Sequence, residues 1–169
     1  MNGPGERRSG VDPDMRALLR RAVQLAADNA DAGQLPFGAL VVRDGTVLAT
    51  GVNTALSDLD PIAHAEVAAI RAACRAVGEV HVSGATVVSS CEPCAVCHGA
   101  AVTAGVVRMV YAAPRDVVPD LGYLAPDRTA GLLTRMQDVL RAAAPDQLVF
   151  VPTDGADEPF ARYLAGVDR

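Results

Sequence analysis

Residues 64–66 read His-Ala-Glu, and residues 93–97 read Pro-Cys-Ala-Val-Cys. The first segment supplies an imidazole and a carboxylate, and the second supplies two thiols. Zinc favours imidazole and thiolate ligands, and three protein ligands leave its fourth position open for water. The remaining carboxylate, that of Glu66, is then an acid/base group beside the metal. Together the two segments predict a catalytic centre with one zinc ion per subunit.

A helix start is predicted just before His64. Asp60 is a favoured N-cap residue, and Pro61 is favoured at the first position of a helix. We therefore predict a helix over residues 62–77. His64 and Glu66 would both lie in its first turn.

Cys91, Cys94 and Cys97 follow one another at intervals of three residues, so spacing alone does not select the zinc-binding pair. Pro93 predicts that a helix begins at Cys94. Cys94 and Cys97 then share one face of its first turn, where the positive helix end favours thiolates. We therefore predict His64, Cys94 and Cys97 as the ligands and Cys91 as a buried small residue.

Strand and helix patterns alternate along the middle of the chain. Strands are predicted over residues 37–42, 46–49, 86–90, 106–112 and 148–151, and helices over residues 13–32, 62–77, 94–104 and 129–144, with a short terminal helix from Pro159. Arg43-Asp44-Gly45 is typical of a hairpin turn. This order predicts an α/β fold with a partly parallel sheet and helices on its faces.

Composition narrows the class of protein. The 169 residues suggest one domain, half of them hydrophobic, with a net charge of -5 and no Lys. Such a chain is a poor nucleic-acid binder, because that affinity rests on phosphate contacts. No apolar run approaches the ~20 residues of a membrane span. We expect a disordered lead over residues 1–11, no signal peptide and a cytoplasmic location, which the clustered cysteines also favour.

Other interpretations of the same residues are open. A lone C-x-x-C pair is also typical of a redox protein or of half a structural zinc site, so a non-catalytic zinc or redox module is an alternative. Asn53 is either a turn residue or a hydrogen-bonding group for a substrate ring. His81 and His98 are expected to be surface or packing residues rather than ligands.

These motifs resemble the cytidine-deaminase-like superfamily and, within it, the bacterial guanine deaminases. The resemblance covers about Leu19 to Tyr163. The matching stretches are Leu-Pro-Phe-Gly-Ala at 35–39, Gly-Val-Asn at 51–53, Asp-Pro-Ile-Ala-His-Ala-Glu at 60–66, Ser-Cys-Glu-Pro-Cys-Ala-Val-Cys at 90–97 and Pro-Phe-Ala-Arg-Tyr at 159–163.

The resemblance implies a three-layer α/β/α sandwich around a mixed five-stranded sheet. It implies Glu66 as the proton shuttle, and Asn53, Phe37 and the backbone of Ala65 as substrate contacts. An acidic residue of the terminal segment would hold the base, for which the candidates are Asp154, Asp157 and Glu158. The guanine enzymes carry Trp where Tyr163 aligns, so this segment is where substrate choice is expected to differ.

The resemblance also implies an activity and an assembly. The expected reaction is zinc-dependent deamination of a free nucleobase, guanine to xanthine plus ammonia, which belongs to purine metabolism. Cytosine-, isocytosine- or aminotriazine-like bases are alternatives, and a tRNA adenosine deaminase is disfavoured by the acidic charge. Residues 12–152 would form the deaminase domain of a homodimer, and residues 153–169 a tail that crosses to the partner's active site.

Overall fold

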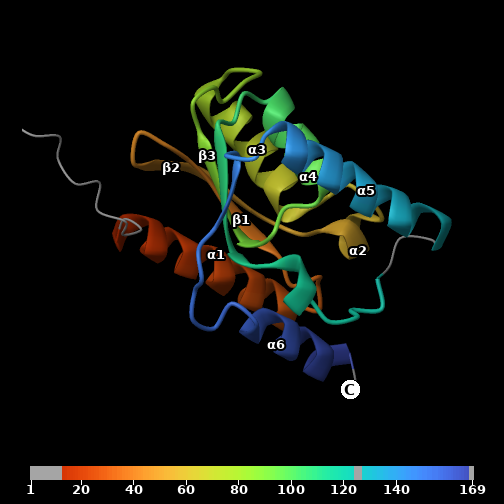
Figure 1. The fold of residues 1–169 in the computed structure, drawn as a ribbon. Helices are drawn as coiled ribbons and strands as arrows, with labels where there is room; N and C mark the ends of the chain where they lie inside the picture. The colour runs from red at the N-terminus through yellow and green to blue at the C-terminus, as the bar shows by residue number, and fades with distance from the viewer. Residues whose placement is uncertain (1–12, 124–126, 168–169) are drawn as a thin grey trace, which may run out of the picture.

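The computed structural model describes residues 13–123 and 127–167 (Figure 1). The elements are α1 (Pro13–Asp31), β1 (Gly38–Arg43), β2 (Thr46–Val52), α2 (Ala55–Asp58), α3 (Ala65–Val77), β3 (Thr86–Cys91), α4 (Ala95–Thr103), β4 (Arg108–Ala113), the 3₁₀ turn η1 (Arg115–Val117), α5 (Asp127–Ala143), β5 (Leu148–Phe150) and α6 (Glu158–Val167). The disordered lead predicted for residues 1–11 lies outside the described residues.

The strands form a mixed five-stranded sheet in the order β2-β1-β3-β4-β5. Strand β1 is antiparallel to both β2 and β3, whereas β3, β4 and β5 are parallel. Asp44 and Gly45 both have positive φ, as the predicted hairpin turn between β1 and β2 requires. The predicted mixed sheet is confirmed.

Helices cover both faces of the sheet. Helices α3, α4 and α5 lie on one face, and α1 and α6 lie on the other (Figure 1). The predicted three-layer sandwich is therefore confirmed. Within the two described segments, no helix combines the length and the apolar character that a bilayer crossing needs.

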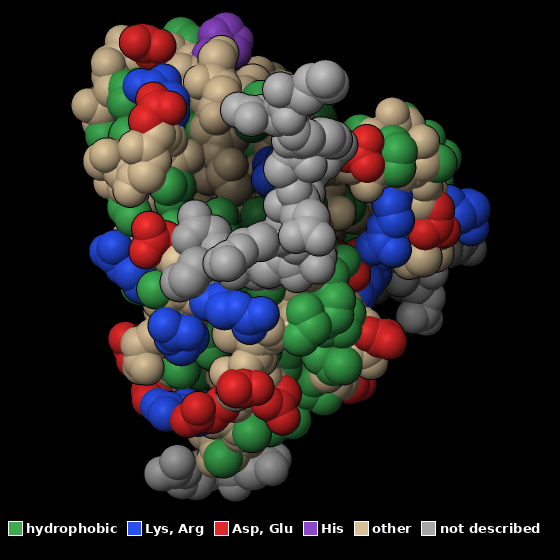
Figure 2. Space-filling view, turned by 60° about the vertical axis from the view of Figure 1, so that its left-hand side comes forward, with side chains coloured by type: hydrophobic (Ala, Val, Ile, Leu, Met, Phe, Trp, Pro, Cys, Tyr) green, Lys and Arg blue, Asp and Glu red, His purple; other side chains and the backbone are tan. Residues whose placement is uncertain are grey.

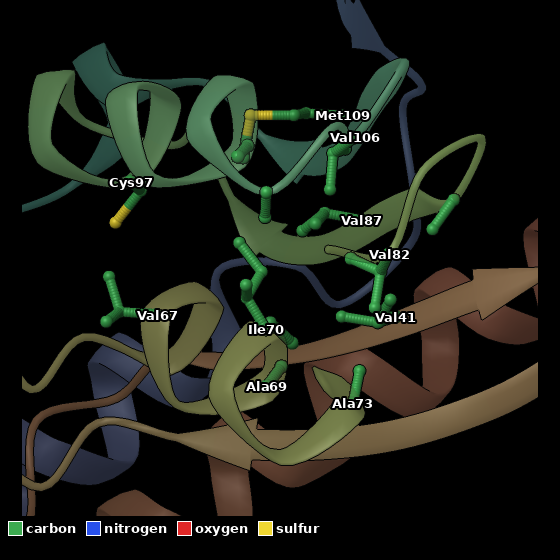
Figure 3. Close-up of a cluster of buried hydrophobic side chains, with 14 of the residues drawn as sticks. Val41, Val67, Ala69, Ile70, Ala73, Val82, Val87, Cys97, Val106 and Met109 are labelled. Carbon is green, nitrogen blue, oxygen red and sulfur yellow. The ribbon is translucent and has the colours of Figure 1, made fainter. Parts of the chain in front are cut away.

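The strands bury side chains on both faces, which explains their nearly continuous apolar runs. One core lies between the sheet and helices α3 and α4 (Figure 3), and it includes Val41, Val67, Ile70, Val87 and Met109. The second core lies under α1 and includes Leu19, Leu40, Val88 and Val110. Alternate residues of a strand therefore face opposite sides of the sheet. Residue 89 lies on the same side as Val87, the side covered by α3 and α4.

Gly51 brings helix α3 unusually close to the sheet. A Cβ atom at this position would lie 2.4 Å from the nitrogen of Ala69 and 2.5 Å from the carbonyl oxygen of Ala65. No larger residue fits there without moving the helix. The start of α3, which carries the first motif, is thereby fixed against the end of β2.

Helix α3 begins at Ala65, three residues later than predicted. Asp60 caps a turn instead of the helix, since its Oδ1 accepts the N–H of Ile62 at 3.0 Å. The Ala63 carbonyl is engaged by the N–H of Thr54 and so does not begin a helical ladder. The predicted helix start at residue 62 is therefore wrong. Glu66 lies in the first turn of α3 as predicted, whereas His64 is the N-cap residue just before the helix.

Two predicted loops contain short helical turns. The loop over residues 57–61 overlaps α2, which ends where Leu59 adopts a left-handed backbone with φ of 52°. The loop over residues 114–127 contains η1, and residues 124–126 of it lie outside the described part. Both segments are connections around the end of the sheet that bears the motifs.

Candidate metal centre and active site

The starts of two helices meet at the first candidate site. His64 is the N-cap residue of α3 and Cys94 is the N-cap residue of α4, both with extended backbone, and Cys97 lies in the first turn of α4. The Nδ1 atom of His64 lies 3.3 Å from the sulfur of Cys97 and 3.4 Å from that of Cys94. The two sulfurs are 3.6 Å apart. Three ligand atoms thus form a compact triangle.

This triangle fits one zinc ion. Tetrahedral zinc with Zn–N near 2.0 Å and Zn–S near 2.3 Å separates its ligands by about 3.6 Å for nitrogen and sulfur and about 3.8 Å for two sulfurs. The observed edges are within a few tenths of an ångström of these values. One imidazole and two cysteines are also a donor set that zinc favours. The predicted ligands His64, Cys94 and Cys97 form a zinc-type site.

The site favours a thiolate. The hydrogen bond from Cys97 and, after it, the contact with His64 together lower the pKa of Cys94 to about 4. The same contact, together with burial, raises the pKa of Cys97. The pKa of His64 is raised, mainly by its hydrogen bond with Cys94. Cys94 is therefore ready to bind a cation at neutral pH, because the thiolate is the metal-binding form.

Cys91 stands apart from this cluster. It is the last residue of β3 and is 4% exposed. It packs with Ala113 and Phe160, and burial raises its pKa to about 12. A neutral, buried thiol of this kind is a packing residue, as predicted.

Glu66 lies beside the three ligand residues. It is 6% exposed, and burial raises the pKa of its carboxyl group. Its Oε2 lies 3.3 Å from the sulfur of Cys97, and its Oε1 accepts a hydrogen bond from the Ser89 hydroxyl at 2.9 Å. A buried carboxyl group with a raised pKa at the edge of a metal cluster is suited to proton transfer.

The predicted substrate contacts Asn53, Phe37 and Ala65 surround the same helix start. Asn53 is 2% exposed, its N–H donates to the Phe37 carbonyl at 3.1 Å, and its Oδ1 accepts the N–H of Ala55 at 3.0 Å. Phe37 packs against the core that contains Ala65 and Cys97. The Asn53 oxygen thus caps a turn, as one of the two interpretations predicts, and its amide nitrogen is the group that the other interpretation assigns to a substrate ring.

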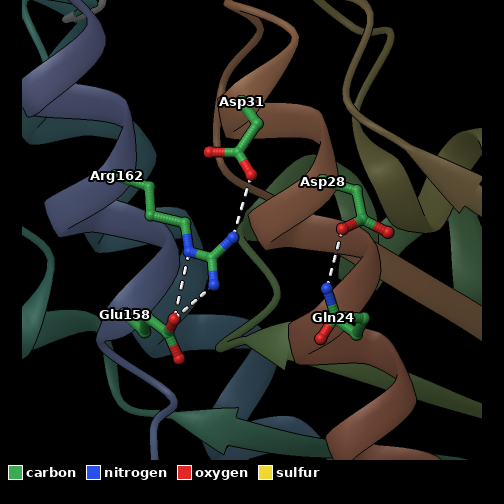
Figure 4. A network of polar contacts seen from close by, with 5 residues as sticks. All are labelled: Gln24, Asp28, Asp31, Glu158 and Arg162. Carbon is green, nitrogen blue, oxygen red and sulfur yellow. Dashed lines mark hydrogen bonds and ion pairs between the residues drawn. The ribbon is translucent and has the colours of Figure 1, made fainter.

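The acidic residues of the terminal segment lie over α1 instead. Glu158 accepts a hydrogen bond from Arg162 at 3.0 Å, and Arg162 also donates to Asp31 of α1 at 2.8 Å (Figure 4). Asp154 lines a small polar pocket with Arg16 and Arg20 of α1. Within one chain, Glu158 pairs with Arg162, and neither Glu158 nor Asp154 belongs to the cluster of His64, Cys94 and Cys97.

Two further contacts hold the loop before Cys94, and the sequence did not predict them. The Gln137 amide nitrogen of α5 donates to the Pro93 carbonyl at 2.9 Å. Arg141, one turn further along α5, forms an ion pair with Glu92. Helix α5 thus fastens the loop that delivers the cysteine ligands. Gln137 is 3% exposed, and a polar residue on the buried face of a helix is the only sequence signal for it.

The other histidines lie outside the cluster. His98 is fully buried, and its Nε2 lies 2.7 Å from the Gln147 side-chain oxygen. His81 is exposed on the segment before β3. Neither belongs to the three-residue cluster found among residues 13–123 and 127–167, in agreement with the prediction.

Fold and site together define a class: an α/β/α sandwich whose two helix starts carry a zinc-type cluster and a buried carboxyl group. The chain belongs to the family described as the cytidine and deoxycytidylate deaminase zinc-binding region, whose model matches residues 13–113. This confirms the resemblance to cytidine-deaminase-like proteins, and the described site contains the zinc ligands of such a domain.

Individual relatives act on different substrates. Guanine deaminase of Bacillus subtilis (strain 168) is 42% identical over 107 residues, which are 63% of this chain and 69% of the relative. The tRNA-specific adenosine deaminase of the same strain is 35% identical over 95 residues, or 56% of this chain and 59% of the relative. The X-ray structure of guanine deaminase from Bacillus subtilis superposes with a TM-score of 0.58 at 30% identity, covering 92% of this chain and 95% of that one.

Proposed function

We propose that this deaminase-family protein hydrolyses guanine to xanthine and ammonia, with zinc held by His64, Cys94 and Cys97. The observation that carries the reaction type is Glu66, a buried carboxyl group 3.3 Å from a ligand sulfur but outside the ligand set. A purely structural zinc site needs four protein ligands and no such neighbour. The similarity to guanine deaminase over 107 residues supports the choice of base.

The chain's own residues supply the proton transfers. His64, Cys94 and Cys97 would hold a zinc ion, which would supply a water that ionises near neutral pH and so serves as the nucleophile. Glu66 accepts the proton that this water loses and delivers it to a ring nitrogen of the base. It then moves the second proton of the water to the departing amine, so that water and guanine leave as xanthine and ammonia. The raised pKa of Glu66 suits a group that both accepts and donates protons.

The residues around the start of α3 are proposed to select and orient the ring. The Asn53 amide nitrogen is a donor for a ring carbonyl, and Phe37 offers an apolar face for stacking. Ala65 has no side-chain bulk beyond Cβ, so its backbone is within reach of a planar ligand. Asp154 and Glu158 are proposed to bind the base from the tail of a partner chain, as the family resemblance implies.

A second candidate is deamination of adenosine in tRNA, which the 35% identity to a tRNA-specific adenosine deaminase favours. The net charge of this chain favours a free nucleobase over tRNA as the substrate. Its net charge is -5, and acidic and basic side chains lie interspersed on the face in Figure 2. Binding to an RNA backbone relies on clustered positive charge.

Ammonia release from a panel of substrates tests the proposal. The panel contains guanine, cytosine, isocytosine, an aminotriazine, guanosine and a tRNA anticodon stem-loop with adenosine at the wobble position. We expect release from guanine with xanthine as the second product. Ammonia release only from a pyrimidine- or triazine-sized ring would replace guanine by that ring as the substrate. Ammonia release only from the stem-loop would replace guanine deamination by tRNA adenosine deamination.

The assembly and the location are also proposals. A groove of about 580 Å³ lies between α3 and α4, away from the zinc ligands, and Ile62 and Val80 beside it are 45% and 83% exposed. Exposed apolar side chains along a groove favour a protein contact, and we propose that a second copy covers them. Sedimentation equilibrium distinguishes this homodimer from a monomer. The cytoplasmic location stays a prediction.

A further inference from the structure

Ser89 is one of two adjacent buried serines in strand β3. It lies near the end of β3, is 2% exposed, and shares the strand face of Val87, which points toward α3 and α4. Its hydroxyl donates to Glu66 Oε1 at 2.9 Å. A buried serine that donates to the proposed proton shuttle can orient that group, and its hydrogen bonds define how.

The hydrogen-bond pattern fixes the direction of the Ser89 proton. The backbone N–H of Cys91 points at the Ser89 oxygen at 3.4 Å and occupies one of its lone pairs. A hydroxyl has a single proton, and the carboxylate is its acceptor. Glu66 Oε1 therefore accepts the hydrogen bond from Ser89. Because Oε1 is occupied in this way, a proton carried by Glu66 is placed on Oε2. This oxygen is the one that lies 3.3 Å from the Cys97 sulfur.

We propose that Ser89 is a positioning residue that locks the Glu66 carboxylate in the rotation that turns Oε2 toward the metal cluster. Carboxylate torsions are broad, so the side chain alone does not define this orientation. A hydrogen bond to a charged group supplies the missing restraint. The inference rests on the proposed function only in naming Glu66 as the proton shuttle.

Replacement of Ser89 by Ala tests the proposal, with Ser90→Ala as the matched control. Ser90 is also 2% exposed, but its hydroxyl accepts the N–H of Gly38 at 3.0 Å, whereas the serine hydrogen bond to Glu66 comes from Ser89. For Ser89→Ala we expect kcat to fall about 10- to 100-fold, as loss of a hydrogen bond to a charged group implies. KM, zinc content and Tm should match those of Ser90→Ala. Ser89→Thr keeps the hydroxyl and should recover most of kcat.

A crystal structure of the zinc-loaded Ser89→Ala protein gives a readout independent of turnover. We expect Glu66 to rotate, so that Oε2 leaves the neighbourhood of the Cys97 sulfur. An unmoved carboxylate, an unchanged kcat, or a loss of zinc comparable to that of a ligand variant would each overturn the proposal. If the wild-type protein deaminates none of the panel, the proposed function fails, while the crystal structure still decides the role of Ser89.

Discussion

Glu66 and Glu158 both lie in the first turn of a helix, α3 and α6 respectively, yet their surroundings differ. Glu66 is buried, accepts a hydrogen bond from the Ser89 hydroxyl and touches the sulfur of Cys97. Glu158 has a side chain that is 55% exposed and pairs with Arg162. A glutamate in the first turn of a helix is thus a buried carboxyl group beside the predicted metal ligands in one region and a surface ion-pair partner in the other. The burial of each carboxyl group and the groups that it contacts determine this difference.

The two regions are also held together differently. The metal centre depends on close backbone packing at Gly51 and on buried hydrogen bonds from Ser89 and Gln137. Helix α6 is held by two buried rings, with Tyr163 in a cluster that includes Ala30 of α1 and Phe160 in a cluster with Cys91 and Ala113, and by an exposed ion pair between Arg162 and Asp31 of α1. Substitutions in the first region should therefore change chemistry, and those in the second should change stability or substrate binding.

The largest effect is expected at the metal ligands. Cys97→Ser should remove zinc and abolish turnover, because the site then keeps only two good ligands and loses a thiolate. Cys91→Ser is the control, since this buried thiol lies outside the cluster. Metal analysis after gel filtration measures both. Equal zinc loss in the two variants would contradict the choice of Cys94 and Cys97.

Glu66→Gln should lower kcat by about 10²- to 10⁴-fold, the range for removal of a general acid/base group. Zinc content should not change, because Glu66 is not a ligand. Glu158→Gln is the paired variant: as a proposed base-binding residue it should raise KM and leave kcat within about twofold. Steady-state kinetics on guanine separate the two. A kcat loss in the Glu158 variant as large as that of Glu66→Gln would erase the distinction between the regions.

Phe160→Ala should destabilise the fold by about 3–5 kcal/mol, as for other buried phenylalanines. Phe160 is 3% exposed, and its ring meets that of Phe37 at a centroid distance of 6.0 Å. Urea denaturation gives the free energy of unfolding. Val167→Ala, at a 63% exposed position of the same helix, is the control and should change it little. A small effect at Phe160 would mean that α6 is not anchored by this ring.

The smallest effect is expected at Arg162. Its guanidinium links Glu158 and Asp31, but both pairs are exposed. Exposed ion pairs are screened by water and salt, so Arg162→Ala should leave Tm almost unchanged and insensitive to added NaCl. Differential scanning calorimetry at low and high salt measures this. A large, salt-dependent fall in Tm would show that ion pairs rather than rings hold α6.

The sheet and the metal ligands were accessible from the sequence because short-range patterns encode them. Pro93 marks the helix start that places Cys94 and Cys97 on one face, and the structure has that helix one residue away from its predicted start. The same kind of pattern gave the wrong start for α3 at Asp60, because a residue that caps a turn and one that caps a helix both use a side-chain oxygen as the acceptor.

The supporting residues were not accessible, because their contacts join distant segments. Ser89 meets Glu66 only once β3 lies beneath α3, and Gln137 meets Pro93 across 44 residues of chain. The orientation of Glu158 depends likewise on Arg162 and on α1, the helix beside it. Local patterns therefore predict which groups perform the chemistry, while tertiary packing determines which groups orient them.

The central claim, zinc-dependent deamination of guanine, is tested most directly by following guanine turnover together with bound zinc in the wild-type protein. We expect one zinc per chain, and xanthine and ammonia in equal amounts. Turnover should be lost when a chelator removes the metal and restored when zinc is returned. A protein that holds one zinc per chain and leaves guanine unchanged would contradict the claim.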